Sequence, residues 1–246
     1  MSTRQPDQLR PTSIEPFATH AAGSVIIRQG GTCVLCTSSI EPEVPAWLPR
    51  DEDGAPLRGW VTAEYAMLPG STGQRKRRGP DGRGTEIQRL IGRVLRASVD
   101  LEAMPGLCVT CDCDVLVADG GTRTASITGA MVALAQALSA AHREGRLMTD
   151  PIRHLIAAVS VGVVDGEVWL DLDYELDVKA EVDMNIAMDD ASRFVEVQGT
   201  AEASPFSRQT LDTMLDRAAG GIEQLIQIQR SAINGPESGE TSRTAR

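Results

Sequence analysis

The chain has few aromatic residues and few histidines. Only 3% of its 246 residues are Phe, Trp or Tyr, which is too few for rows of base-stacking platforms. The histidines are scattered, so they predict neither a set of metal ligands nor a Ser-His-Asp triad. They are His20, His142 and His154.

Long apolar runs are absent as well. The longest, residues 155–164, is interrupted by Ser160 and Gly162 and is far shorter than the ~20 residues that span a bilayer. Residues 1–8 lack the apolar core of a secretory signal, and the five cysteines are an odd number. We therefore expect a reduced, cytoplasmic protein with no membrane partner.

The cysteines fall into two groups that invite a zinc interpretation, Cys33 with Cys36 and Cys108 with Cys111 and Cys113. Both groups lie within apolar strand patterns, where Cys33 and Cys36 should face opposite ways. Structural zinc sites usually place such pairs on turns. Buried free thiols are therefore the favoured interpretation, with a metal site as the alternative.

Acidic residues outnumber basic ones. The chain has 24 Lys and Arg and 34 Asp and Glu, which gives a formal net charge of −10. On average, this charge disfavours a nucleic-acid partner. Residues 75–96, however, contain eight basic and two acidic residues. A glycine-rich basic loop there suits the backbone of a flexible single strand. The alternative is a solvated loop followed by helix arginines that pair with acids of a partner subunit.

Hydrophobic periodicity predicts strands and helices mixed along the whole chain. Gly30-Gly31 and Asp165-Gly166 are predicted as hairpin turns. Thr85 is predicted to cap a helix, with Glu86 in its first turn. The other predicted helices are 125–145 and 207–233, and the predicted strands are 23–29, 32–40, 59–68, 107–117, 154–164, 167–173, 184–188 and 193–197.

Residues 41–58 and 70–84 have the composition of loops, and residues 234–246 that of a disordered tail. No linker divides the remaining elements. The sequence therefore predicts an α+β or α/β class and a single domain of residues 1–233.

A first candidate site is the segment 119–126, Asp-Gly-Gly-Thr-Arg-Thr-Ala-Ser, which follows a predicted strand and opens a helix. Glycines let the backbone approach a ligand, and free N–H groups at a helix N-terminus favour an anion. Arg123 adds a fork that matches phosphate. A capped helix start after a tight turn fits the segment equally well. The chain contains no Walker loop.

A second candidate is the acidic stretch that follows the predicted strand 167–173. Carboxylates close in space can hold a hard divalent cation such as Mg²⁺ or act as a general acid or base. A charge run is more often a solvated loop, so the stretch alone does not establish a site. Its acidic residues are Asp171, Asp173, Glu175, Asp177, Glu181 and Asp183.

Taken together, these segments resemble the ribonuclease PH family of phosphate-dependent 3′-to-5′ exoribonucleases. The most specific match is the run Ala118-Asp-Gly-Gly-Thr-Arg-Thr-Ala-Ser-Ile-Thr-Gly-Ala, and the resemblance covers residues 6–233. Gly70 and Val182 stand where family members often have Arg and Thr, and Gly82-Arg83-Gly84-Thr85-Glu86 replaces the usual Gly-Arg-Thr-Met-Glu. The matching segments are 7–11, 20–24, 34–37, 59–69, 86–93, 112–116, 118–130, 157–162, 183–185 and 195–202.

The resemblance implies an α+β fold like the second domain of ribosomal protein S5, with mixed sheets packed with helices. It implies a homohexameric ring, built as a trimer of dimers. It also implies a reversible reaction in which inorganic phosphate attacks the last phosphodiester of an RNA and releases a nucleoside 5′-diphosphate. The family trims 3′ ends of tRNA precursors, so RNA is the expected partner.

The resemblance also assigns the site residues. The arginines and helix-start N–H groups would offset the repulsion between the attacking and the scissile phosphate. The paired aspartates would hold Mg²⁺, or one of them would protonate the leaving oxygen, and both roles stay open. The assigned residues are Arg83, Gly121, Thr122 and Arg123 for phosphate, Asp177 and Asp183 for catalysis and metal, and Arg75 and Arg78 for RNA.

Two other functions are considered beside this one. A non-catalytic RNA-binding ring subunit, like the inactive relatives in exosome rings, typically lacks the phosphate-site Arg or the paired aspartates, and this chain keeps both. The second alternative function is a small-molecule kinase of related fold, and no ATP-loop motif in the sequence supports it.

Overall fold

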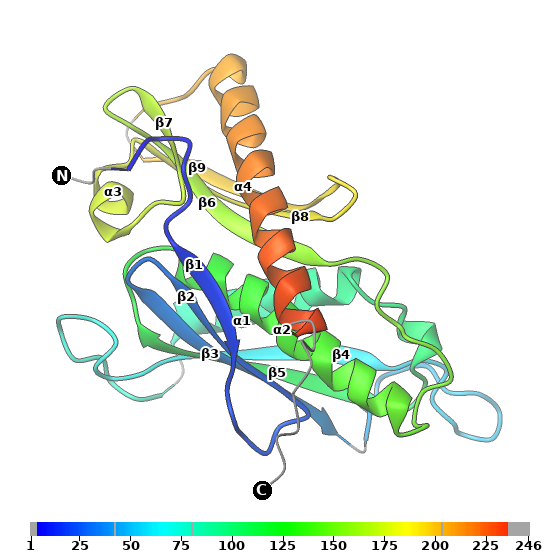
Figure 1. The fold of residues 1–246 in the computed structure, drawn as a ribbon. Helices are drawn as coiled ribbons and strands as arrows, with labels where there is room; N and C mark the ends of the chain where they lie inside the picture. The colour runs from blue at the N-terminus through cyan, green and yellow to red at the C-terminus, as the bar shows by residue number, and fades with distance from the viewer. Residues whose placement is uncertain (1–3, 42, 80, 203, 236–246) are drawn as a thin grey trace, which may run out of the picture.

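The computed structural model describes residues 4–41, 43–79, 81–202 and 204–235 (Figure 1). In chain order the elements are β1 (Thr12–Pro16), β2 (Gly23–Gln29), β3 (Thr32–Glu41), β4 (Trp60–Met67), α1 (Gly82–Ala97), a 3₁₀ turn η1 (Leu101–Ala103), β5 (Cys108–Val117), α2 (Thr122–Arg143), β6 (Ile156–Val164), β7 (Glu167–Leu170), α3 (Tyr174–Lys179), β8 (Val182–Asp189), β9 (Phe194–Ala201) and α4 (Arg208–Asn234).

The nine strands of the described residues form two sheets. The first has the order β1-β2-β3-β5-β4 and the second the order β7-β6-β8-β9. All neighbours are antiparallel except β4 and β5, which are parallel and are connected through α1. The two predicted hairpins are confirmed, because β2 pairs with β3 and β6 with β7. Strands β8 and β9 also pair as antiparallel neighbours. Asp165 and Gly166 both have positive φ, 52° and 76°, as the tight turn between β6 and β7 requires.

The sheets and helices form alternating layers (Figure 1). Helices α1 and α2 cover one face of the first sheet, and α2 also packs on β6 of the second sheet. Helix α4 covers the opposite face of the second sheet and reaches β1. The apolar core accordingly falls into two large clusters, one around α2 between the sheets and one between the second sheet and α4.

Helix α2 is apolar on all sides because it lies between two sheets. It is the one helix among the described residues that is long and apolar enough to cross a membrane, but 83% of that stretch is buried in the protein. Such a helix is typical of a buried core element. Gly129 permits the close packing, since a Cβ there would lie 2.7 Å from Sγ of Cys36.

The predicted helix starts are wrong at two places. Helix α1 begins at Gly82, inside the expected loop, because Asp81 rather than Thr85 is the N-cap and accepts a hydrogen bond from the N–H of Gly84. Glu86 therefore lies beyond the first turn. Helix α2 begins at Thr122, three residues before the expected start.

The acidic stretch is also more ordered than the sequence indicates. Strand β7 ends at Leu170, and residues 174–179 form the short helix α3. Asp173 caps it, accepting a hydrogen bond from the N–H of Leu176 at 2.9 Å. The tail expected to be disordered lies outside the described residues beyond residue 235.

All five cysteines are free and buried, as predicted. Cys36 and Cys113 face each other across β3 and β5, and both contact the carbonyl of Ser126 in α2. Among the described residues, no group of three or more His, Cys, Asp or Glu side chains is placed to hold a metal ion. The cysteines therefore serve as core side chains.

A buried ion pair fixes the N-terminal arm to the rest of the protein. Nη2 of Arg10 lies 2.7 Å from Oδ1 of Asp171, and the backbone N–H of Arg10 donates to Oδ2 at 2.8 Å. The two residues are only 6% and 0% exposed. Nη1 of Arg10 also donates to the carbonyl of Asp119, just before α2. The pair therefore joins the arm, the residue after β7 and the turn that opens α2.

Replacing Arg10 by Met should be strongly destabilising, because it leaves the buried carboxylate of Asp171 without its charged partner. We expect a loss of about 3–5 kcal/mol in the free energy of unfolding, measured by urea denaturation. The double variant with Asp171→Asn should recover part of this loss, since it removes the unpaired charge.

The exposed pair of Arg208 and Asp212 provides the control. Arg208→Met should lower the free energy of unfolding by less than about 1 kcal/mol, because solvent screens that pair. Equal losses in the Arg10 and Arg208 variants would contradict the assigned role of the buried pair.

Candidate phosphate and RNA site

The turn between β5 and α2 is built on two glycines with left-handed backbone conformations. Gly120 and Gly121 have φ values of 71° and 63°. A Cβ on Gly120 would lie 2.6 Å from the backbone of Asp173, and one on Gly121 would lie 3.0 Å from Nη2 of Arg10. Gly121 is the N-cap of α2 and provides no side-chain cap. The first N–H groups of the helix are therefore suited to an anion.

Thr122 and Arg123 occupy the first turn of α2 and are held by side chains from other elements. Oγ1 of Thr122 lies 2.9 Å from the hydroxyl of Tyr65 at the end of β4. Nη1 of Arg123 donates to Oε1 of Gln198 at 3.1 Å and lies 4.0 Å from Oε1 of Glu86. Gln198 in turn donates to Glu86 at 3.2 Å. These contacts orient the guanidinium at the helix start.

Arg83 lies in the first turn of α1, and its charge acts on the same group of residues. Burial raises the pKa of Tyr65 above its ordinary value, and the hydrogen bond to Thr122 opposes this rise. The positive charges of Arg83 and Arg123 also lower the pKa of Tyr65. The altered order Gly82-Arg83-Gly84 therefore still leaves this arginine close enough for its charge to act on Tyr65.

The paired aspartates lie beside these arginines. Asp183 is the second residue of β8, and Asp177 lies in α3. Burial raises the pKa of Asp183, and the negative charge of Asp177 raises it further.

The charges of Arg123 and Arg83 oppose that rise in the pKa of Asp183. Oδ1 of Asp183 is buried without a hydrogen-bond partner among the described residues. A carboxyl group that is desolvated in this way, between opposed charges, is typical of a functional site.

The structure separates the six acidic candidates. Asp171 is bound to Arg10 and Asp173 caps α3, so both carboxylates already have structural partners. Glu181 accepts from the N–H of Gly166 at 3.2 Å, in the turn between β6 and β7. Glu175 is exposed on α3. Asp177 and Asp183 are thus the two carboxylates whose charges interact beside the arginines.

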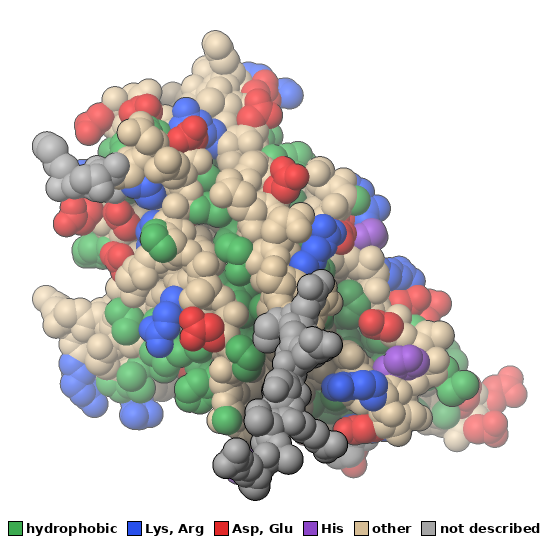
Figure 2. Space-filling model, in the orientation of Figure 1, with side chains coloured by type: hydrophobic (Ala, Val, Ile, Leu, Met, Phe, Trp, Pro, Cys, Tyr) green, Lys and Arg blue, Asp and Glu red, His purple; other side chains and the backbone are tan. Residues whose placement is uncertain are grey.

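The basic segment 75–78 lies in the connection between β4 and α1. Figure 2 shows basic side chains over this connection and acidic side chains over α3, on the same side of the molecule. Arg75 and Arg78 are exposed, and neither side chain makes a hydrogen bond or ion pair with the described residues. Both are therefore available to an external anion.

The arginines of α1 are bound within the chain to different extents. Arg93 forms an ion pair with Glu196 of β9 at 3.0 Å. Arg96 lies over the ring of Trp60, 4.4 Å from its centroid, and donates to the carbonyl of Val61. Arg89 is exposed and makes no hydrogen bond or ion pair with the described residues. The alternative of ion pairs with a partner subunit is thus open for Arg89, whereas Arg93 and Arg96 have partners in their own chain.

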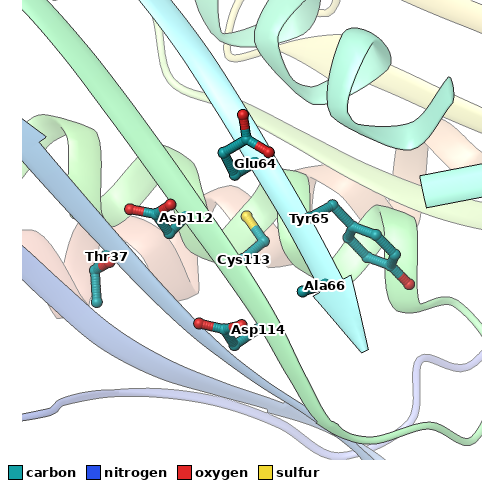
Figure 3. Close-up of a pocket in the computed structure, with 7 residues that line it drawn as sticks. All are labelled: Thr37, Glu64, Tyr65, Ala66, Asp112, Cys113 and Asp114. Carbon is teal, nitrogen blue, oxygen red and sulfur yellow. The ribbon is translucent and has the colours of Figure 1, made fainter. Parts of the chain in front are cut away.

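A separate hollow of about 270 Å³ lies on the first sheet (Figure 3). Burial raises the pKa of Asp112 there, as do the nearby charges of Asp114, Glu64 and Glu41. It has no arginine or lysine in its lining, so it does not suit phosphate. Its lining residues are Thr37, Glu64, Tyr65, Ala66, Asp112, Cys113 and Asp114.

Sequence reasoning missed the residues that hold the site together. Arg10 lies in a matching segment but carries no signal of its partner, which is 161 residues away. Gln198 and Glu86 likewise meet Arg123 only because the fold brings β9 and α1 to the start of α2. Residues of this kind are found through the fold and not through local spacing.

Comparison with known proteins identifies the fold. Residues 8–139 match the 3′ exoribonuclease family, domain 1, and residues 154–221 match domain 2 of that family.

Three solved structures are similar. An Archaeoglobus fulgidus exosome with RNA bound to the active site is 23% identical, with a TM-score of 0.77 over 91% of this chain and 90% of that chain. Rice (Oryza sativa) Rrp46 is 21% identical, with a TM-score of 0.74 over 95% of this chain and 99% of that chain. An archaeal exosome core is 22% identical, with a TM-score of 0.74 over 92% of this chain and 89% of that chain.

At these identities the similar structures establish the fold, and the α+β architecture of ribonuclease PH proteins is confirmed. The two family matches together cover most of the chain. The chain therefore belongs to the 3′ exoribonuclease family, the ribonuclease PH family that its sequence resembles.

Proposed function

We propose that the protein is a phosphorolytic 3′-to-5′ exoribonuclease that trims the 3′ ends of tRNA precursors. The observation that carries the proposal is the convergence of two arginines, a free helix start and two aspartates. The charges of Arg83, Arg123 and Asp177 all act on Asp183. Such an arrangement suits the transfer of a nucleotidyl group to inorganic phosphate.

In this reaction, an oxygen of inorganic phosphate attacks the last phosphorus of the RNA. The bond between that phosphorus and the 3′ oxygen of the preceding nucleotide breaks, and a nucleoside 5′-diphosphate leaves. Arg83, Arg123 and the first N–H groups of α2 bind the attacking phosphate and offset its repulsion from the scissile phosphate. Thr122 adds a hydroxyl that Tyr65 orients.

The leaving 3′ oxygen needs a proton or another positive charge. The raised pKa of Asp183 favours its protonated form, which suits a general acid. In the alternative role, Asp183 and Asp177 together would hold Mg²⁺. Carboxylates with water and substrate phosphate are the ligands that Mg²⁺ prefers. Bound Mg²⁺ would stabilise charge that develops on the leaving oxygen.

A second candidate is an RNA-binding subunit of an exosome-like ring without activity of its own. The comparisons support it at least as strongly as tRNA trimming, because two of the similar structures named above are exosome structures. Arg123 and the paired aspartates favour catalysis, since a purely structural subunit has no need of them. Under either function, we propose that the protein assembles into a ring and works in the cytoplasm. The ring is a homohexamer if this chain is its only subunit.

The product formed from a 3′-extended tRNA distinguishes these functions. With Mg²⁺ and phosphate, the wild-type protein should shorten the RNA and release nucleoside diphosphates. Asp183→Asn should reduce turnover at least 100-fold, in line with the loss of a general acid or metal ligand, and should leave RNA binding intact. Shortening without phosphate, release of monophosphates, or no shortening at all would contradict the proposal.

The same variant tests whether Asp183 has a structural role. Because the folded state raises its pKa, its ionised form opposes folding at neutral pH. Asp183→Asn should therefore match or exceed the wild-type melting temperature at pH 7. The difference should shrink as the pH falls through the raised pKa and the wild-type carboxyl becomes protonated. A lower melting temperature or loss of the assembly would indicate a structural role instead.

Removing positive charge from the exposed basic segment should weaken RNA binding. The double variant Arg75→Ala/Arg78→Ala should lose affinity and show a shallower dependence of affinity on salt, by about two phosphate contacts. Binding is measured by fluorescence anisotropy at several salt concentrations. Arg208→Ala, on the exposed surface of α4, is the control and should bind as the wild type does. Unchanged affinity and salt slope in the double variant would exclude the segment from RNA binding.

A further inference from the structure

Tyr174 presents an exposed aromatic ring beside the paired aspartates. It is the first residue of α3 and is 62% exposed. The chain has only two tyrosines, and the other, Tyr65, is buried against Thr122. An exposed tyrosine ring offers a flat apolar face that a ligand can contact directly.

The N-terminal end of α3 is fixed by two contacts. The backbone N–H of Tyr174 donates to Oδ1 of Asp119 at 3.4 Å. The backbone of Asp173 lies so close to Gly120 that a Cβ there would approach it to 2.6 Å. The first turn of α3 is therefore packed directly against the turn that opens α2, where phosphate is expected.

The direction of the ring follows from the helix period. Leu176 is partly buried and packs against the apolar cluster of Val164, Leu172 and Ala180. Tyr174 lies two residues before Leu176, which is about 200° around the helix, so it faces away from that cluster. Asp177 lies three residues after Tyr174 and is its neighbour on the helix surface. The ring and the carboxylate are thus presented side by side.

We propose that Tyr174 stacks on the 3′-terminal base of the RNA and so positions the last phosphodiester at Asp177 and Asp183. This inference rests on the proposed function and names the group that holds the terminal nucleotide. Stacking on a ring is tolerant of base identity, because every base has a π-face. A single platform at the site agrees with a chain that has too few aromatic residues for a row of them.

The test uses a short single-stranded RNA with 2-aminopurine at its 3′ end, whose fluorescence is quenched by stacking. It is added without phosphate, so that no turnover occurs. The wild type and Tyr174→Phe should quench the probe and bind with similar affinity. Tyr174→Ala should lose the quenching and bind about ten-fold more weakly, the usual effect of removing one stacked base contact.

Val178→Ala is the matched control, because Val178 is 67% exposed on the same helix and has no ring. It should behave as the wild type does. In phosphorolysis, Tyr174→Ala should raise KM more than it lowers kcat, since stacking holds substrate before and during the reaction.

Retained quenching in Tyr174→Ala, or equal losses in the Phe and Ala variants, would overturn the proposal. A change of assembly state in Tyr174→Ala would also overturn it and would assign the ring to a subunit contact. Quenching by a wild-type protein that releases no diphosphates would overturn the proposed function and leave the stacking in place.

Discussion

The buried ion pair between Arg10 and Asp171 is the interaction on which the site depends. It holds three segments that are far apart in the sequence: the N-terminal arm, the residue after β7 and the turn before α2. Nη2 of Arg10 also lies close to Gly121, so the same guanidinium packs against the turn that opens α2. A charge that is fully buried must be paired, so these segments cannot separate without exposing or stranding one partner. The positions of α2 and α3 relative to each other follow from this constraint.

At the candidate site, nearby charges of both signs act on the carboxyl group of Asp183 and do not cancel. Asp183 is desolvated and faces the negative charge of Asp177, which opposes its ionisation. The positive charges of Arg83 and Arg123 reduce the cost of ionising Asp183. Among the described residues, neither arginine forms a hydrogen bond with this carboxyl group. The folded state thus keeps an unfavourable carboxylate near two cations, of which Arg123 is also paired with Glu86 at 4.0 Å. This imbalance suits a site that is completed by an anionic substrate.

The sequence predicted the strands from β2 to β9, because turn residues such as Asp165-Gly166 and alternating apolar residues are local signals, but it did not predict β1. The family resemblance pointed to Arg123, Asp177 and Asp183, although only Arg123 lies in the long and specific run of residues 118–130. Sequence reasoning failed where the deciding contact is distant or competes with another local signal. Asp81 caps α1 in place of Thr85, and α3 forms within a stretch that charge alone describes as a loop. The partners of Arg10 and Arg123 come from elements that only the fold brings together.

The central claim is that Arg83, Arg123 and the start of α2 form a binding site for inorganic phosphate. Calorimetric titration of phosphate into the RNA-free protein tests it without any assumption about the RNA. We expect the wild type and Arg208→Ala to bind phosphate alike and Arg123→Ala to lose this binding. Phosphate binding that is unchanged in Arg123→Ala, or absent from the wild type, would contradict the account.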